Sequence, residues 1–255
     1  MSDLLLLLKE EGASGPAPVT PIDPDTLLGT KSVAVKAGSG ISKSGINVAY
    51  WYDYYKGGSN PGFDSYSGTL APPLVTQTRE TPNFSSNFHF VSTDWNIIDF
   101  DKGTIFVAFI PQAASVGLFS WYKASDDYFR AYTDASNVLH LAGGDDAAHT
   151  FTLDGPTLTP GEIYVAAFQF DNANKTMAMY TSGSKVEETL TNWDTNNRWL
   201  NIGTSMKLAV TTGTTDTNCD ILDWFCFESY YDEATVNGVL AYFSERWGLT
   251  WSSTL

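Results

Sequence analysis

The sequence has few charged residues and very few basic ones. Charged side chains make up 17% of the 255 residues, and 14 lysines and arginines stand against 29 aspartates and glutamates, giving a net charge of -15. A protein that neutralises nucleic-acid phosphates needs the opposite balance, so we expect no nucleic-acid partner. Disorder is not expected either, because 43% of the residues are hydrophobic and 14% are aromatic, enough to build a buried core.

Cysteine is nearly absent, and the N-terminal leucine run is too short to cross a membrane. Cys219 and Cys226 lie in one predicted strand, where seven residues span roughly 23 Å, so they cannot bond to each other. We expect both to be small buried side chains. The run Leu4–Leu8 is shorter than a signal-peptide core of roughly 7–15 residues. We therefore expect neither secretion by a signal peptide nor membrane insertion.

Catalytic motifs are also missing. The sequence contains no Gly-x-Ser-x-Gly, no His-Glu-x-x-His and no phosphate-binding glycine loop. Asp220 and Asp223 are three residues apart and should face opposite sides of a strand, while Asp99 and Asp101 share a face without a third acid. These carboxylates are the only candidates for a glycan-cleaving site, and we expect the protein not to be an enzyme.

What the sequence does contain begins with an N-terminal arm, residues 1–30. A leucine-rich tag is followed by a proline-rich spacer, and prolines favour extended backbone over helix or central strand. Such an arm either docks on another subunit or folds back onto its own domain. The residues predicted to dock on a partner are Leu4, Leu5, Leu6, Leu7, Leu8, Pro16, Pro18 and Pro21.

Residues 31–255 read as one β-sandwich, because short β-rich runs follow one another with little helix between them. The run Thr104–Ile110 is continuously apolar, which is typical of a strand buried on both faces. Asp171–Lys175 separates two such runs and predicts a hairpin turn. One helix is expected near the C-terminus, capped by Asp232 and ended by Gly248. Its apolar stripe consists of Val236, Val239, Leu240, Phe243 and Trp247.

Two groups of side chains are candidates for binding. An aromatic run is predicted to form a subunit interface or a glycan-stacking platform, unless its rings are buried within one sheet, because Tyr and Trp combine apolar area with a polar tip. It consists of Tyr50, Trp51, Tyr52, Tyr54 and Tyr55. The calcium candidates are the loop acids Asp126, Asp127, Asp145 and Asp146. Solvated loop acids are the expected alternative, so no cofactor is predicted.

Four segments carry a family resemblance in their order and spacing: Leu158–Asp171, Met179–Gly183, Leu200–Gly203 and Trp224–Phe243. Through them the stretch from about Phe84 to Leu249 resembles the laminin-G-like, concanavalin A-like lectin/glucanase superfamily. The sequence departs from the pattern at Tyr164, where the family usually has Trp, and at Thr181-Ser182. The resemblance implies an all-β, jelly-roll β-sandwich with one short C-terminal helix, here preceded by the extended arm.

The closing helix followed by Trp247-Gly248 resembles the ends of such domains in bacteriophage structural proteins. With the arm, this resemblance leads us to expect a non-enzymatic bacteriophage virion protein, in the first place a capsid decoration or head-surface subunit. Its expected partners are the major capsid protein or neighbouring copies of itself in a homo-oligomer, and its expected location is the virion. The alternative is a glycan-binding host-adsorption module of a tail or fibre.

Overall fold

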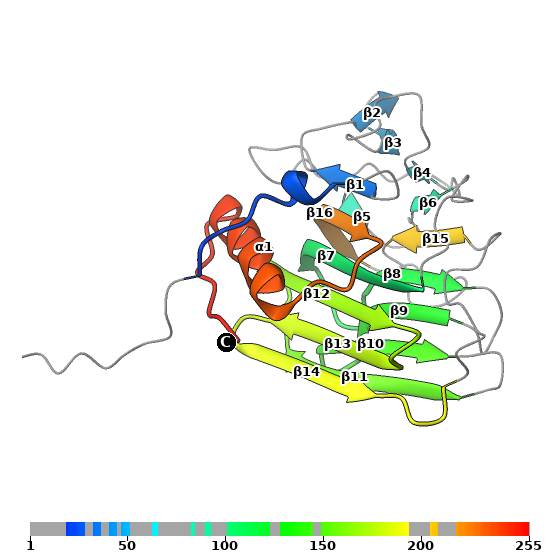
Figure 1. The fold of residues 1–255 in the computed structure, drawn as a ribbon. Helices are drawn as coiled ribbons and strands as arrows, with labels where there is room; N and C mark the ends of the chain where they lie inside the picture. Colours follow the sequence, from blue (N-terminus) through cyan, green and yellow to red (C-terminus); the bar gives the residue numbers. More distant parts are fainter. Residues whose placement is uncertain are drawn as a thin grey trace, which may run out of the picture.

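The computed structural model describes residues 19–28, 33–36, 41–44, 47–51, 63–65, 83–84, 90–92, 101–122, 128–144, 149–193, 205–208 and 218–254. Within these residues the strands form two antiparallel sheets, and one α-helix covers the outer face of the first sheet (Figure 1). The prediction of an all-β sandwich with a C-terminal helix is confirmed.

The first sheet has seven described strands, in the order β1 (Val33–Lys36), β16 (Cys219–Phe227), β7 (Lys102–Pro111), β12 (Tyr164–Asp171), β13 (Thr176–Thr181) and β14 (Ser184–Thr189), with β5 (Asn83–Phe84) also paired to β16. The second sheet has nine described strands, in the order β11 (Thr150–Thr157), β10 (Val138–Gly144), β9 (Tyr128–Thr133), β8 (Gly117–Tyr122), β15 (Ser205–Leu208), β6 (Phe90–Ser92), β4 (Phe63–Ser65), β3 (Asn47–Trp51) and β2 (Ile41–Ser44).

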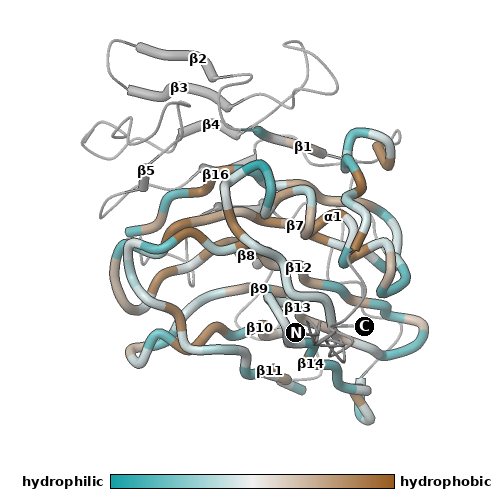
Figure 2. The backbone as a smooth tube through the Cα atoms, turned by 90° about the vertical axis from the view of Figure 1, so that its left-hand side faces the viewer, coloured by the Kyte–Doolittle hydropathy of each residue, from teal (hydrophilic) through white to brown (hydrophobic). Residues whose placement is uncertain are grey.

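Two apolar layers hold the sandwich together. The first lies between the sheets, where Phe119 of β8 packs edge-on against Phe168 of β12. The second lies between the first sheet and α1 (Glu233–Arg246), where Phe225 of β16 packs against Phe243. Strand β7 supplies alternate side chains to each layer, which explains its continuous apolar sequence. In Figure 2, which colours the backbone by hydropathy, hydrophobic residues follow the central strands and hydrophilic residues lie at many turns.

The local signals for the helix and the hairpin are confirmed. The carboxylate of Asp232 accepts a hydrogen bond from the Thr235 N–H at 2.8 Å, and Gly248 has a φ of 72° just after the helix. The turn between β12 and β13 is held by Asp171, whose Oδ1 accepts from the Asn174 N–H at 3.0 Å, and Lys175 there has a φ of 56°. In the described part of the chain, no helix is long and apolar enough to cross a membrane.

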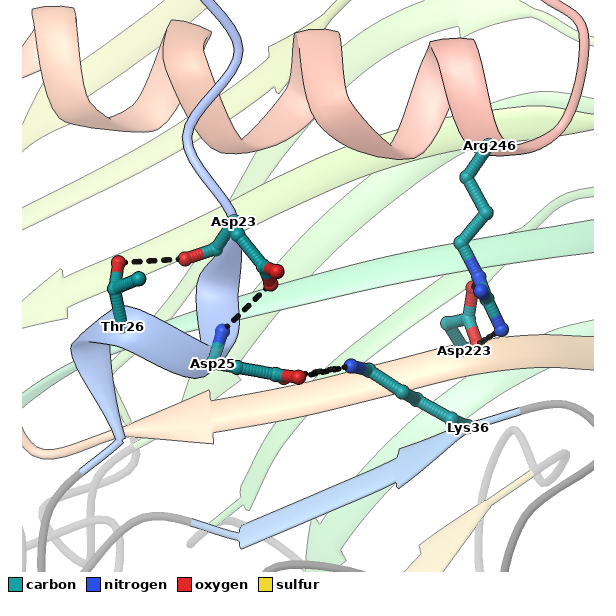
Figure 3. Close-up of polar contacts among 6 residues, drawn as sticks. All are labelled: Asp23, Asp25, Thr26, Lys36, Asp223 and Arg246. Atoms are coloured by element: carbon teal, nitrogen blue, oxygen red, sulfur yellow. Dashed lines mark hydrogen bonds and ion pairs between the residues drawn. The ribbon is translucent and has the colours of Figure 1, made fainter.

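The described end of the predicted arm, residues 19–28, lies against the chain's own helix. The Ile22 N–H donates to the Gly238 carbonyl at 2.9 Å. A 3-10 helix, Pro24–Leu27, is capped by Asp23, whose carboxylate accepts from the Asp25 N–H at 3.0 Å (Figure 3). These residues, which include Pro21, therefore fold back onto the chain's own domain, the second of the two alternatives predicted for the arm. Leu4, Leu5, Leu6, Leu7, Leu8, Pro16 and Pro18 lie outside the described residues.

Strand β16 carries both cysteines and corrects one prediction. Cys219 and Cys226 are free and fully buried, as expected, and burial raises the pKa of both thiols. Asp220 and Asp223 were expected on opposite faces, but they share one. The register between β16 and β7 shifts between Ile221 and Asp223. Both aspartates are therefore paired with β7 residues whose side chains face α1.

Candidate functional site

A row of three side chains stands on the outer face of the nine-stranded sheet. In β9 the core-facing residues are Phe129 and Ala131, so Tyr128, Arg130 and Tyr132 point away from the core. The Cζ atom of Arg130 lies 4.7 Å from the ring centroids of both tyrosines. The planar guanidinium is thus held between two aromatic rings, an arrangement that favours a fixed orientation for its N–H donors. We call these three residues the Tyr-Arg-Tyr row.

Small residues flank this row on the neighbouring strands. Arg130 is paired with Ser120 of β8 and with Ala142 of β10, and Tyr128 is opposite Gly144. Ser120 is 1% exposed, and its Oγ has no hydrogen-bond partner. Because the neighbours are short, the long side chains of the row stand above them, and all three row residues are half-buried.

His140 of β10 extends the row toward two carboxylates. Its ring lies 5.1 Å from the Tyr132 ring, measured between centroids. Its Nδ1 is 2.8 Å from Oδ1 of Asp154, and its Nε2 is 3.4 Å from Oδ2 of Asp134. The imidazole therefore links strand β11 to the turn between β9 and β10, and in its protonated form both ring nitrogens donate.

Asp134 is fixed by the turn that joins β9 to β10. Its Oδ1 accepts hydrogen bonds from the Val138 N–H at 2.9 Å and the Ser136 N–H at 2.8 Å. These bonds, that of Val138 first, together with His140, lower the pKa of the Asp134 carboxyl. Asn137 adopts a φ of 62°, which Asn tolerates well. The turn thus holds an ionised carboxylate beside the imidazole.

The chemistry of this surface suits a polyhydroxylated ligand. Tyrosine rings offer flat apolar faces, while the guanidinium, the imidazole and the carboxylates offer donors and acceptors in fixed positions. Among the described residues, no group of three or more His, Cys, Asp or Glu side chains is arranged to hold a metal ion. The calcium candidates Asp126, Asp127, Asp145 and Asp146 lie outside the described residues.

The aromatic run predicted as an interface or glycan platform is largely outside the described residues. Tyr52, Tyr54 and Tyr55 are not described, and for Tyr50 and Trp51 the structure gives only their backbone place in β3, where they pair with β2 and β4. β3 belongs to the same nine-stranded sheet as the Tyr-Arg-Tyr row. That prediction stays a prediction.

Of the carboxylates considered for catalysis, the two in β16 are described in full, and neither is open to a substrate. Asp220 and Asp223 are fully buried beneath the helix layer, where Gln112 Nε2 donates to Asp220 at 2.8 Å. Arg246 Nε donates to Asp223, also at 2.8 Å (Figure 3). No substrate reaches such carboxylates. Asp101 is exposed before β7, and Asp99 lies outside the described residues.

The Tyr-Arg-Tyr row was not among the predicted sites, although the sequence carries one signal for it. Tyr128, Arg130 and Tyr132 alternate with Phe129 and Ala131, a pattern that places the first three on one solvent-facing side of a strand. The contribution of His140 was hidden, because only the β9–β10 register brings it opposite Tyr132.

The sequence matches no protein-family model, and a search of curated proteins found no match. Among solved structures, the chain is similar to the receptor-binding domain of botulinum neurotoxin mosaic serotype C/D, with a TM-score of 0.59 and 8% identity over 84% of this chain and 50% of that one. It is similar to Trypanosoma rangeli sialidase, with a TM-score of 0.58 and 9% identity over 90% of this chain and 37% of the sialidase chain.

A third structure, the CBM40 of Ruminococcus gnavus IT-sialidase bound to alpha2,3 sialyllactose, matches with a TM-score of 0.47 and 17% identity over 55% of this chain and 83% of that one. This likeness is too partial to carry an argument. The first two show the fold, which is consistent with a concanavalin A-like sandwich. Neither of them is described as a bacteriophage protein.

Proposed function

We propose that this chain is a non-enzymatic glycan-binding module that uses the Tyr-Arg-Tyr row as its binding surface. One observation carries the proposal: Arg130 is held 4.7 Å from two tyrosine rings that, like it, stand half-buried on the outer face of the nine-stranded sheet. The rings supply stacking surfaces for the C–H faces of a sugar, and Arg130 and His140 supply directional hydrogen bonds to its hydroxyls.

The conformation of this surface is fixed before any ligand arrives. The Tyr132 ring packs between Arg130 and His140. The His140 imidazole is hydrogen-bonded to Asp154 and lies 3.4 Å from Asp134. A ligand therefore meets side chains that have already lost most of their rotamer freedom, which lowers the entropic cost of binding.

A glycan array tests the proposal. We expect wild-type protein to bind at least one glycan class, and we expect Arg130→Ala and Tyr132→Ala to weaken binding by about ten-fold or more. Lys102→Ala removes an exposed cation at the start of β7 and serves as the matched control that leaves binding unchanged. Absence of glycan binding, or full binding by both row variants, would overturn the proposal, and release of cleaved sugar would contradict its non-enzymatic part.

The role as a bacteriophage virion subunit is a separate proposal, supported by sequence features alone. These are the leucine-rich tag Leu4–Leu8, the prolines that follow it and the Trp247-Gly248 ending. We propose that deletion of residues 2–18 abolishes incorporation into particles while the sandwich stays folded, because residues 19–28 keep their contacts with α1 and with Lys36 of β1. Incorporation of the truncated chain at the wild-type level would refute a docking arm.

A further inference from the structure

A pocket of about 280 Å³ opens where strands β12 and β13 part. The first residues of β12, Tyr164, Val165 and Ala166, pair with β7, but pairing between β12 and β13 starts only at Ala167 opposite Tyr180. Val165 and Ala166 line one side of the pocket, and Thr181, at the end of β13, lines the other side. The break in pairing therefore accounts for the opening.

The pocket reaches into the protein core and is bordered on one side by the C-terminal segment. Phe109 and Leu139 line it from the layer between the two sheets, and Leu249 and Thr250 line it from the chain that follows α1. The rings of Phe109 and Tyr164 lie with centroids 5.9 Å apart and planes tilted by 33°, and both residues line the pocket. An aromatic ligand finds stacking or edge contacts at such a wall.

One polar atom in the lining is buried without a partner. Ser244 of α1 is 1% exposed, and its Oγ makes no hydrogen bond. A serine inside a helix ordinarily bonds back to the carbonyl four residues earlier. An unsatisfied buried hydroxyl destabilises the protein, and a ligand group that bonds to Ser244 removes this penalty.

We propose that this pocket binds a small, uncharged aromatic molecule that carries one hydrogen-bonding group, which bonds to Ser244 Oγ. The described lining residues include no Lys, Arg, His, Asp or Glu, so a charged ligand would lose its hydration without gaining a counter-charge. An apolar cavity of roughly 150 Å³ in another protein holds benzene, so this pocket has room for two fused rings. The site is distinct from the Tyr-Arg-Tyr row, whose residues do not line it.

Equilibrium dialysis of the full chain against three related probes tests the proposal: 2-naphthol, naphthalene and 2-naphthoate. We expect 2-naphthol to bind and the anionic 2-naphthoate to bind at least about ten-fold more weakly. Ser244→Ala should weaken 2-naphthol binding by about three- to ten-fold, the loss expected for one hydrogen bond, and should leave naphthalene binding unchanged.

A second variant keeps the test decisive if Ser244→Ala does not fold. Thr250 is exposed and lines the pocket, so Thr250→Trp should abolish 2-naphthol binding. Ala234→Trp, at an exposed position of α1 outside the lining, is the matched control and should bind normally. Failure of the wild-type chain to bind 2-naphthol overturns the proposal, as does equal binding by Thr250→Trp. Arg130→Ala should leave naphthol binding intact, which separates this site from the glycan surface.

Discussion

Ile22 lies so close to Gly238 that a Cβ added to this glycine would meet Cδ1 of Ile22 at 2.5 Å and Cγ1 at 2.6 Å. The Ile22 N–H donates to the Gly238 carbonyl at 2.9 Å, so the segment before β1 packs on the bare backbone of α1. A glycine in a helix interior costs about 1 kcal/mol relative to alanine. The close approach of Ile22 is what this glycine makes possible.

The contact predicts opposite effects of Gly238→Ala in two backgrounds. In the wild type, we expect a net destabilisation of about 1 kcal/mol, because displacing Ile22 outweighs the helix gain. In an Ile22→Ala background, the same change should be neutral or stabilise by up to about 1 kcal/mol. Urea unfolding of the four proteins measures the difference, and an equal effect in both backgrounds would show that the two residues are not coupled.

Truncations separate the described end of the arm from the residues before it. We expect deletion of residues 2–18 to change the free energy of unfolding by less than about 0.5 kcal/mol. Deletion of residues 2–28 should cost about 2–3 kcal/mol, because it removes the half-buried Ile22 from its contact with α1 and Asp25 from its ion pair with Lys36 at 2.6 Å. Urea midpoints with unchanged slopes check this, and equal stability of the two truncations would contradict the packing of residues 19–28.

A buried ion pair joins β16 to the end of α1 and predicts a second destabilisation. Asp223 is fully buried and accepts from Arg246 Nε at 2.8 Å (Figure 3). It also accepts from Trp247 Nε1 at 2.7 Å. Arg246→Met keeps the apolar stem but removes the counter-charge, so it should destabilise the protein by about 3 kcal/mol.

The same pair offers a rescue that distinguishes charge from packing. Adding Asp223→Asn to Arg246→Met should recover part of the lost stability, because the amide is neutral and still accepts from Trp247. Lys102→Met, at an exposed position, is the control and should change stability by less than about 0.5 kcal/mol. A double variant less stable than Arg246→Met would show that the buried charge is not the cause.

The helix cap gives the folded state a measurable dependence on pH. Hydrogen bonds from the side chain and backbone of Thr235 lower the pKa of Asp232 below its ordinary 3.8. Near that pH the unfolded chain binds more protons, so the contribution of Asp232 is present above 3.8 and is lost as pH falls through the folded-state pKa. Urea unfolding between about pH 6 and 3 should show a smaller loss for Asp232→Asn, which caps without titrating, than for the wild type. Equal losses would contradict this.

The ends of α1 and the turn between β12 and β13 were predicted correctly from short sequence motifs. Asp232 and Gly248 bracket α1, and Asp171–Lys175 forms the turn between β12 and β13, because capping and turn geometry depend on the residues themselves. The bulge in β16 was not predictable. Cys219–Phe227 is buried on both faces, so its sequence carries no alternation from which a one-residue shift is visible.

The candidate site, too, could be predicted only as far as local sequence patterns reach. The outward side of β9 is readable from the alternation of Tyr128, Arg130 and Tyr132 with apolar residues. The partnership of Tyr132 with His140, and of His140 with Asp154, depends on the register of three strands. Likewise the pocket beside Ser244 arises from a break in pairing between β12 and β13, which no local pattern records.

The geometry of the Tyr-Arg-Tyr row predicts that charge alone does not sustain binding. Arg130→Lys keeps the positive charge but loses the planar group that lies 4.7 Å from both rings. We expect affinity for the best glycan of the array to fall by about ten-fold, whereas Tyr132→Phe, which keeps the ring, should change it by less than about three-fold. Calorimetric titration measures both. Full affinity in Arg130→Lys would mean that the site needs only a positive charge at this position. That result would contradict a role for the planar, stacked guanidinium, which lysine cannot reproduce.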